Sequence, residues 1–301
     1  MRFLVAAYAR MTPAKLLAQQ ALTFDAFTGG RLLLNLINGR DNIMATYGIT
    51  TPHDDRYALG EAYWRQFHEH YKAGNPTNFP NTPLVIEPTQ TGGIPLWGAG
   101  DSPAGLVHAG KVVDVYLTVM RGLERIGGQF DAARASAQAQ GRRFADLGAL
   151  ASVLVRPTRA EAEAHFYTMF ERTGVDTIRA KLEEAIRRRT KGEQSLATFE
   201  APDERRRDWV RSLLAGRLPA LEELRLERRL FAGMTAWSPL DIFDAGSSAV
   251  YFVGNPEDIT ENIAAYHAKV GLTALILAAW PLIEEAQTVS RLLLPRLAEI
   301  G

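Results

Sequence analysis

A chain of 301 residues, 47% hydrophobic and 23% charged, is long enough to bury the core of one large globular domain. Lys plus Arg equals Asp plus Glu at 34 each, so no global field attracts nucleic acid or an anionic membrane surface. The chain has no cysteine, which excludes disulfides, thiolate catalysis and cysteine-ligated metal. Its apolar stretches are too short to cross a bilayer. We therefore expect a cytoplasmic protein that binds neither nucleic acid nor membranes.

Short aliphatic and β-branched runs alternate along the chain with longer segments of helical period. This alternation predicts βαβ units and a parallel sheet, an α/β fold. The expected strands are residues 3–8, 32–37, 96–99, 112–118, 149–156 and 273–279. The expected helices are residues 13–27, 57–71, 103–109, 122–140, 159–172, 259–270 and 283–300. Asn255, Pro256 and Asp258 together indicate a capped helix start.

Two segments break this alternation. Residues 75–94 contain Pro76, Pro80, Pro83 and Pro88 and predict a long loop. Residues from about 173 to 248 are of helical period and rich in Arg and Glu, so we interpret them as a helical insertion before the last strand. Their charged runs are typical of solvated helix faces. The alternative interpretation is a mobile lid over an active site.

Polar residues collect where two of the expected strands end. Asn35 lies inside an otherwise apolar strand, and Asn38 follows at its end. Asparagine favours turns for its own local hydrogen bonds, which accounts for Asn38 without a ligand. Asn35 is different, because a buried side-chain amide needs partners and a ligand is one source of them.

A glycine-rich turn follows the third expected strand. It reads Gly98-Ala-Gly-Asp101-Ser102-Pro103-Ala-Gly105, and Pro103 predicts a helix start. The free N–H groups of that helix and the Ser102 hydroxyl could cradle a phosphate. The turn is neither a Walker A loop nor a complete dinucleotide-binding fingerprint.

A second polar run, His53-Asp-Asp-Arg56-Tyr57, precedes the second long helix. Asp54 or Asp55 could serve only to cap that helix. Arg56 and Tyr57 could instead reach a phosphate, Arg56 through its forked donors.

The remaining histidines predict no metal site. His68 and His70 are two residues apart on a helix and face different ways. His108, His165 and His267 lie in helical patterns, where we expect partly exposed surface positions. Neither a Ser/His/Asp triad nor an H-E-x-x-H motif is present, so we assign no catalytic residue.

Taken in order, these segments resemble the bacterial luciferase-like, flavin-dependent monooxygenases, most closely the alkanesulfonate monooxygenase branch. The similarity runs through residues 3–7, 28–39, 53–57, 95–105, 113–118, 253–256 and 277–286. It implies a single TIM-type (β/α)8 barrel domain over residues 1–301. It also implies an enzyme that takes reduced FMN from a separate flavin reductase and uses O2 to oxygenate a small organic substrate. Relatives of this kind are commonly homo-oligomers.

The resemblance assigns residues to two sites. By position, the flavin contacts of the family fall on Ala6, Ala7, Asn35, Asn38, Arg56, Tyr57, Asp101 and Ser102. The substrate pocket falls on Leu150, Ser152, Trp280 and Leu282. The sulfonate-oxidising branch has Arg and His at the first two of these pocket positions, and Tyr and His at the last two. Because a buried sulfonate without that Arg loses its charge-assisted partner, we expect a less polar substrate, even a neutral one.

The start of the chain departs from the family pattern. Family members carry two βα units before the strand that begins here at Phe3, and the six expected strands do not close an eight-stranded barrel. We therefore expect an N-terminally incomplete barrel with exposed strand edges and a tendency to self-associate. Three alternatives stay open: an F420-dependent oxidoreductase of the same superfamily, a truncated non-catalytic flavin-binding relative, and, more remotely, a phosphosugar-binding barrel.

Overall fold

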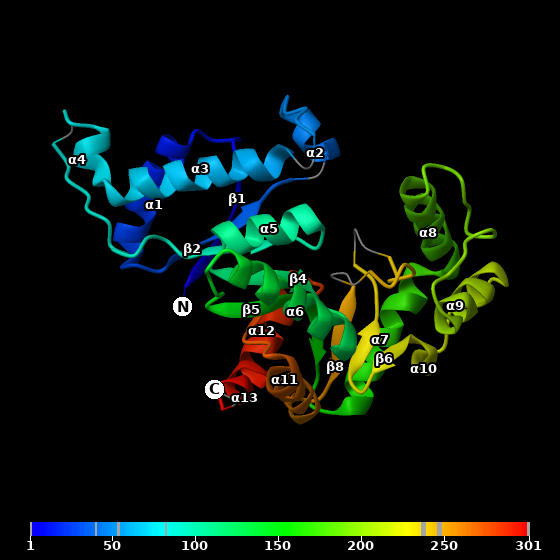
Figure 1. Cartoon of the computed structure of the whole chain (residues 1–301). Helices are drawn as coiled ribbons and strands as arrows, with labels where there is room; N and C mark the ends of the chain where they lie inside the picture. Colours follow the sequence, from blue (N-terminus) through cyan, green and yellow to red (C-terminus); the bar gives the residue numbers. More distant parts are fainter. Residues whose placement is uncertain are drawn as a thin grey trace. The chain divides into compact units, whose positions relative to one another are not determined.

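The computed structural model describes residues 2–39, 41–52, 55–81, 83–235, 239–245 and 249–299 (Figure 1). The chain has an α/β fold with mainly parallel strands, and it divides into two compact units. Unit 1 comprises Met1–Thr118 and Gly128–Gly148, and unit 2 comprises Val119–Gly127 and Ala149–Gly301. Each unit carries its own strands, helices and buried side chains.

Unit 1 is built on parallel strands paired in chain order: β1 (Phe3–Tyr8), β2 (Leu32–Ile37), β3 (Leu96–Ala99) and β4 (Val115–Val119). Helix α3 (Asp55–Lys72) contacts both α1 (Ala14–Thr28) and α5 (Pro103–Val112) (Figure 1). The short helices α2 (Asp41–Thr46) and α4 (Gly74–Asn78) and most of α6 (Leu123–Ala139) complete the unit. The buried residues of α1 recur at helical spacing, which explains why this segment forms a helix with one face on the core: Ala14, Ala18, Ala21, Leu22 and Asp25.

A fully buried carboxylate, Asp25, joins four segments of unit 1. It accepts hydrogen bonds from the backbone N–H of Leu32 at 3.0 Å, the hydroxyl of Tyr71 at 2.7 Å and the side-chain amide of Gln90 at 3.0 Å. These donors come from the start of β2, from α3 and from the loop before β3. Burial raises the pKa of Tyr71 well above its usual range, so this hydroxyl stays a donor.

Unit 2 contains the rest of the strands. Within it, β5 (Asp146–Val155, from Ala149 on) pairs in parallel with β8 (Val250–Gly254), and β9 (Ala274–Ala278) also pairs with β5. On the other edge of β8 lie two short antiparallel strands, β7 (Leu230–Ala232) and then β6 (Arg225–Glu227). All five residues of β8 are buried, which is typical of a strand covered on both faces.

Unit 2 also contains most of the remaining helices. The long ones are α7 (Arg159–Thr173), α8 (Val175–Arg189), α9 (Glu204–Leu214), α11 (Pro256–Val270) and α12 (Leu282–Leu292). The short ones are α10 (Leu221–Leu224) and α13 (Leu294–Leu297). Both α7 and α11 contact β8. The ring of Phe166 on α7 lies 5.4 Å from that of Phe231 and 5.6 Å from that of Tyr251, centroid to centroid. Aromatic burial therefore fixes α7 against the strands.

Most of the predicted elements are confirmed. The first three strands have the predicted bounds, and Asn255 caps α11 by accepting from the Asp258 backbone N–H at 2.8 Å. Strand β8 was missed, because its five residues form an apolar run too short to distinguish from helix by periodicity. The hairpin β6–β7 lies in the segment expected to be helical, where Arg and Glu at helical spacing hid a strand pair formed by tertiary contact.

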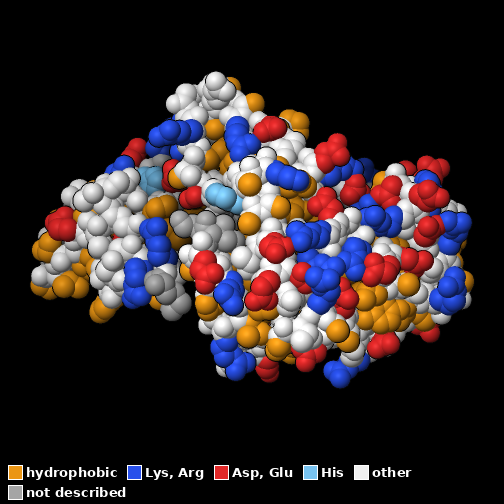
Figure 2. Space-filling view, turned by 90° about the horizontal axis from the view of Figure 1, so that it is seen from below, with side chains coloured by type: hydrophobic (Ala, Val, Ile, Leu, Met, Phe, Trp, Pro, Cys, Tyr) orange, Lys and Arg blue, Asp and Glu red, His pale blue; other side chains and the backbone are white. Residues whose placement is uncertain are grey.

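The surface agrees with the balanced composition. On the face shown in Figure 2, basic and acidic side chains are intermixed over most of the charged area, as expected for a net charge of +0. Within the part of the chain that the structure describes, no helix combines the length and hydropathy that a bilayer span requires.

The Asp25 network gives a prediction for the stability of unit 1. Replacing Asp25 by Ala removes the acceptor of two buried donors, the Leu32 N–H and the Tyr71 hydroxyl. It also removes one of the two acceptors of the part-buried Gln90 amide, so we expect the free energy of unfolding to fall by about 2–4 kcal/mol. The variant Tyr71→Phe removes one donor and keeps the rest, and should cost about 1 kcal/mol. Urea unfolding followed by circular dichroism measures both, and equal losses for the two variants would contradict the central role of the carboxylate.

Candidate functional site

The strand register places the first predicted flavin contacts in the sheet of unit 1. Ala6 pairs with Asn35, Asn35 with Trp97, and these three residues therefore share one face of the sheet. On that face Ala6 is exposed and Asn35 is half-buried. Ala7 lies on the opposite face, where it is buried beside Leu36. The structure thus groups Ala6 with Asn35 and separates both from Ala7.

The glycine-rich turn after β3 forms a tight cradle. Helix α5 starts at Pro103, as the sequence predicted. The Ser102 hydroxyl, which the sequence suggested only as a phosphate contact, caps this helix by accepting from the Gly105 backbone N–H at 3.1 Å. A Cβ added to Gly100 would lie 2.6 Å from the carbonyl carbon and oxygen of Gly105. Backbone therefore packs on backbone across the turn, and only glycine at position 100 permits this approach.

Tyr57 and Ser102 meet at the start of α5. A Cβ built on Gly105 would lie 3.0 Å from the Tyr57 hydroxyl oxygen and 3.1 Å from the Ser102 hydroxyl oxygen. Two hydroxyl groups from two different elements thus flank one point at the positive end of a helix. Such a place suits a phosphate, because hydroxyls and free backbone N–H groups donate to its oxygens.

Asn38 belongs to the same corner of unit 1. Its side-chain oxygen lies 3.0 Å from the position a Cβ would take on Gly60 of α3, and His108 Cε1 lies 3.4 Å from that position. The absence of a side chain at Gly60 therefore leaves room for Asn38 and His108 to approach α3. The Asn38 oxygen is buried and accepts no hydrogen bond from the residues that the structure describes. It is a candidate ligand-facing group.

His108 was expected on the surface, and this prediction is wrong. The residue is 3% exposed, and its ring lies 5.3 Å from the ring of Tyr57, centroid to centroid. Burial lowers the pKa of His108 to about 4, against the opposing effect of Glu61, so the imidazole is neutral at neutral pH. The sequence signal was available: His108 lies three residues after Gly105 and shares its helix face.

Arg56 and Asp101 are the sequence neighbours of Tyr57 and Ser102. Arg56 is 4% exposed at the start of α3, and as the neighbour of Tyr57 in the helix it points in a different direction. Asp101 accepts from three donors at 3.3 Å: the Tyr116 hydroxyl, the Thr118 hydroxyl and the Gln129 amide. These donors hold its carboxylate toward β4 and α6. His53 and Asp54, which begin the second polar run of the sequence, lie outside the described residues.

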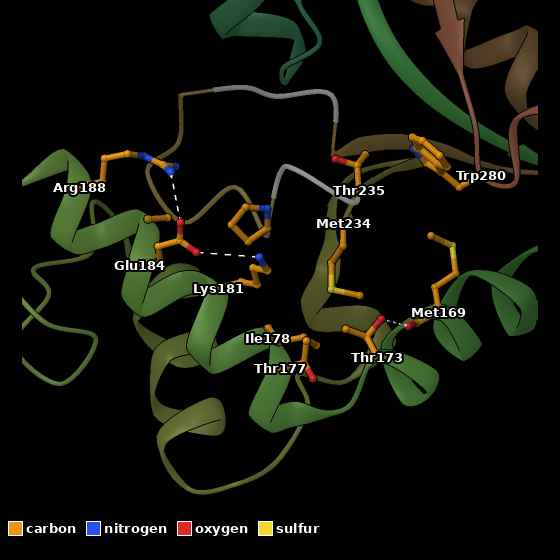
Figure 3. Close-up of a pocket in the computed structure, with 12 residues that line it drawn as sticks. Met169, Thr173, Thr177, Ile178, Lys181, Glu184, Arg188, Met234, Thr235 and Trp280 are labelled. Atoms are coloured by element: carbon orange, nitrogen blue, oxygen red, sulfur yellow. Dashed lines mark hydrogen bonds and ion pairs between the residues drawn. The ribbon is translucent and has the colours of Figure 1, made fainter. Parts of the chain in front are cut away.

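Unit 2 holds a separate cavity of about 620 Å³, drawn in Figure 3. Of the four predicted substrate-pocket residues, Trp280 lines this cavity. Ser152 is fully buried and forms a hydrogen bond with Tyr251, whose pKa burial raises to about 12. Leu282 is 54% exposed at the start of α12, and Leu150 is half-buried in β5. The structure therefore places only Trp280 of this set on the cavity wall.

Metal chemistry has no visible centre in the described ranges. Among these residues, no group of three or more His, Asp or Glu side chains is arranged to hold a metal ion. The polar corner of unit 1 is instead made of hydroxyls, amides and backbone N–H groups, which are the donors that a phosphorylated organic cofactor uses.

A sequence profile of the luciferase-like monooxygenases matches residues 2–273. The chain belongs to this family.

Solved structures with the same fold cover nearly the whole chain. DmoA from Hyphomicrobium sulfonivorans is 16% identical with a TM-score of 0.68, over 99% of this chain and 68% of its own. A riboflavin lyase, solved with modified FMN and riboflavin, is 16% identical with a TM-score of 0.67, over 99% and 70%. An F420-dependent tetrahydromethanopterin reductase from Methanopyrus kandleri is 14% identical with a TM-score of 0.55, over 99% and 83%. At these identities the likeness shows the fold alone.

The backbone contact between Gly100 and Gly105 gives a prediction for binding. Gly100→Ala forces the start of α5 away from the turn, and we expect at least a tenfold loss of FMN affinity, about 1.4 kcal/mol. Gly128→Ala is the matched control, because its added Cβ meets no atom within 4 Å and it lies inside α6. Quenching of FMN fluorescence measures both affinities. Equal affinities in the two variants would show that the cradle does not take part in binding.

His108 gives a prediction for stability against pH. The unfolded histidine gains a proton near pH 6.5, whereas the folded one gains it only near pH 4. Its contribution to stability is therefore present above pH 6.5 and is lost as pH falls toward 4. In His108→Phe this loss is absent. The stability of the native chain relative to the variant should thus fall by up to roughly 3 kcal/mol between pH 7 and pH 4. Denaturant titrations at several pH values measure the free energy of unfolding of both proteins. A difference between them that does not change with pH would contradict the prediction.

Proposed function

We propose that this chain is an FMN-dependent monooxygenase of the two-component type. In this proposal a separate flavin reductase supplies reduced FMN, and the chain uses it with O2 to oxygenate a small organic substrate. The observation that carries the proposal is the cradle at the start of α5, where the hydroxyls of Tyr57 and Ser102 flank the Gly105 backbone. Membership of the luciferase-like monooxygenase family supports it.

The residues of the cradle fit the phosphate end of FMN. Gly100 and Gly105 keep Cβ atoms out of the turn, and α5 is ten residues long, so its N-terminus carries a full helix dipole. Ser102 uses an oxygen lone pair to cap the helix and keeps its O–H free to donate. Asn38, Ala6 and Asn35 remain proposed contacts for the rest of the flavin.

The chemistry divides between the cofactor and the chain. Reduced FMN, when bound, supplies the electrons and the oxygen activation that the reaction needs. The side chains of unit 1 bind and orient the phosphate end, with neutral His108 packed against the ring of Tyr57. Asp101, turned toward β4 and α6 by its three donors, leaves the helix start to the incoming anion.

The finer structural and cellular predictions are part of the same proposal. We propose an incomplete (β/α)8 barrel forming one functional domain over residues 1–301, with residues 173–248 inserted before the last strand. We also propose a homo-oligomer in the cytoplasm that meets its reductase transiently. The substrate pocket of this proposal includes Trp280, with Leu150, Ser152 and Leu282 as further positions.

F420-dependent hydride transfer is the second candidate. One structure with this fold is an F420-dependent reductase, and this chain covers 83% of it. F420 also carries a phosphate, so the cradle alone does not separate the two cofactors. Titration with each cofactor, followed by absorbance and fluorescence, separates them. Binding of FMN without oxidation of any substrate in the presence of a flavin reductase would favour a non-catalytic flavin-binding protein.

Substitutions at Ser102 test the phosphate contact. Ser102→Asp keeps a side chain that caps helices but places a negative charge at the cradle, so we expect FMN affinity to fall by more than about tenfold. Riboflavin has no phosphate, and its affinity should change by less than about twofold. Thermal melting checks that α5 is intact. If FMN and riboflavin lost affinity equally, the phosphate would not lie at this helix start.

A further inference from the structure

The cavity of unit 2 has the size of a small-molecule site. Its volume of about 620 Å³ lies within the range typical of ligand pockets. Its walls come from the end of α7, one face of α8, the segment after β7 and Trp280 (Figure 3). All of the described residues that line the cavity belong to unit 2.

One part of the cavity is apolar and adaptable. Its most buried lining residues are Ile178 at 1% exposure, Ala185 at 6% and Met234 at 8%. Met169 and the ring of Trp280 lie nearby on the same cavity (Figure 3). Thioether side chains are flexible and make favourable contacts with aromatic and aliphatic groups alike. This wall therefore suits the apolar part of a ligand, and its flexible side chains can adjust to ligands of different shapes.

The other part of the cavity is charged, and its charges come from one helix. Lys181, Glu184 and Arg188 follow one another at spacings of three and four residues on α8, so they face the cavity together. Glu184 lies between the two cations, with N–O distances of 3.9 Å to Lys181 and 3.7 Å to Arg188. These distances exceed those of charge-assisted hydrogen bonds, which are about 2.7–2.9 Å. The pair of cations is therefore only partly compensated.

Arg187, the residue before Arg188, forms a closer ion pair than the two cations at the cavity. Arg187, on another face of α8, donates to Glu183 at 2.5 Å, and Glu183 also accepts from the Leu196 backbone N–H at 2.6 Å. Arg187 is therefore paired more closely than either cation at the cavity. At the cavity, the excess of two cations over Glu184 favours an anion.

We propose that this cavity binds an organic anion with an apolar body. The anionic head group lies at Lys181 and Arg188, and the apolar body lies against Met169, Ile178 and Met234. Only the identification of this ligand as the substrate rests on the proposed function. It revises the expectation of a neutral substrate, which considered the loss of positive charge at Leu150 on β5 and not the cations on α8.

Binding to the chain of residues 1–301 tests the proposal without flavin, reductase or O2, so failure of the proposed function would not affect the outcome. Decanoate is the probe, and decan-1-ol is its neutral match of equal chain length. Isothermal titration calorimetry measures the affinity of each probe. Any change in tryptophan fluorescence on binding that is lost in Trp280→Phe arises at the cavity. We expect decanoate to bind with a stoichiometry of one and at least about tenfold more tightly than decan-1-ol.

Variants on α8 locate the head group. Lys181→Ala with Arg188→Ala should lower decanoate affinity by about tenfold or more and leave decan-1-ol affinity within about twofold. Arg187→Ala, the matched control, should leave both within about twofold. Met169→Gln should weaken both ligands. The proposal is overturned if decanoate does not bind, if both probes bind equally, or if Arg187→Ala weakens decanoate as much as the double variant.

Discussion

The close backbone approach between Gly100 and Gly105 is the constraint on which the candidate cofactor site depends. It sets where α5 begins, and α5 in turn carries the Ser102 cap at its start and His108 one turn further on. Tyr57 reaches the same point from α3. Two chain segments that are distant in sequence, residues 100–108 and the start of α3, thus supply this polar corner, and the contact that sets the start of α5 involves no side chain. In the sequence, such a backbone contact is marked only by small residues.

The candidate sites of the two units differ in the kinds of interaction that they offer a ligand. Unit 1 offers hydroxyls, an amide oxygen and backbone N–H groups, which recognise oxygen atoms by direction. Unit 2 offers an apolar wall and loosely paired charges along α8, which recognise size and sign and tolerate variation in shape.

The sequence predicted the fold where local pattern and tertiary environment agree. The bounds of β1, β2 and β3 followed from short apolar runs, the start of α5 followed from Pro103, and the cap of α11 followed from Asn255-Pro256. The sequence did not predict the elements whose structure is determined by tertiary contacts. Nothing local distinguishes the buried β8 from a helical turn, and the charged hairpin β6–β7 exists because its strands pair with each other and with β8. His108 was misplaced for the same reason: burial on α5 depends on the helix that packs against it.

Strand β8 has a consequence for the motions of unit 2. It is buried along its whole length, pairs with β5 on one edge and β7 on the other, and contacts α7 and α11. By contrast, every residue of β9 is half-buried. Amide protons of β8 can therefore exchange with solvent only when the whole unit opens, whereas those of β9 can exchange through smaller local openings. The slowest-exchanging amides of unit 2 therefore mark the segment around which it unfolds as a cooperative whole.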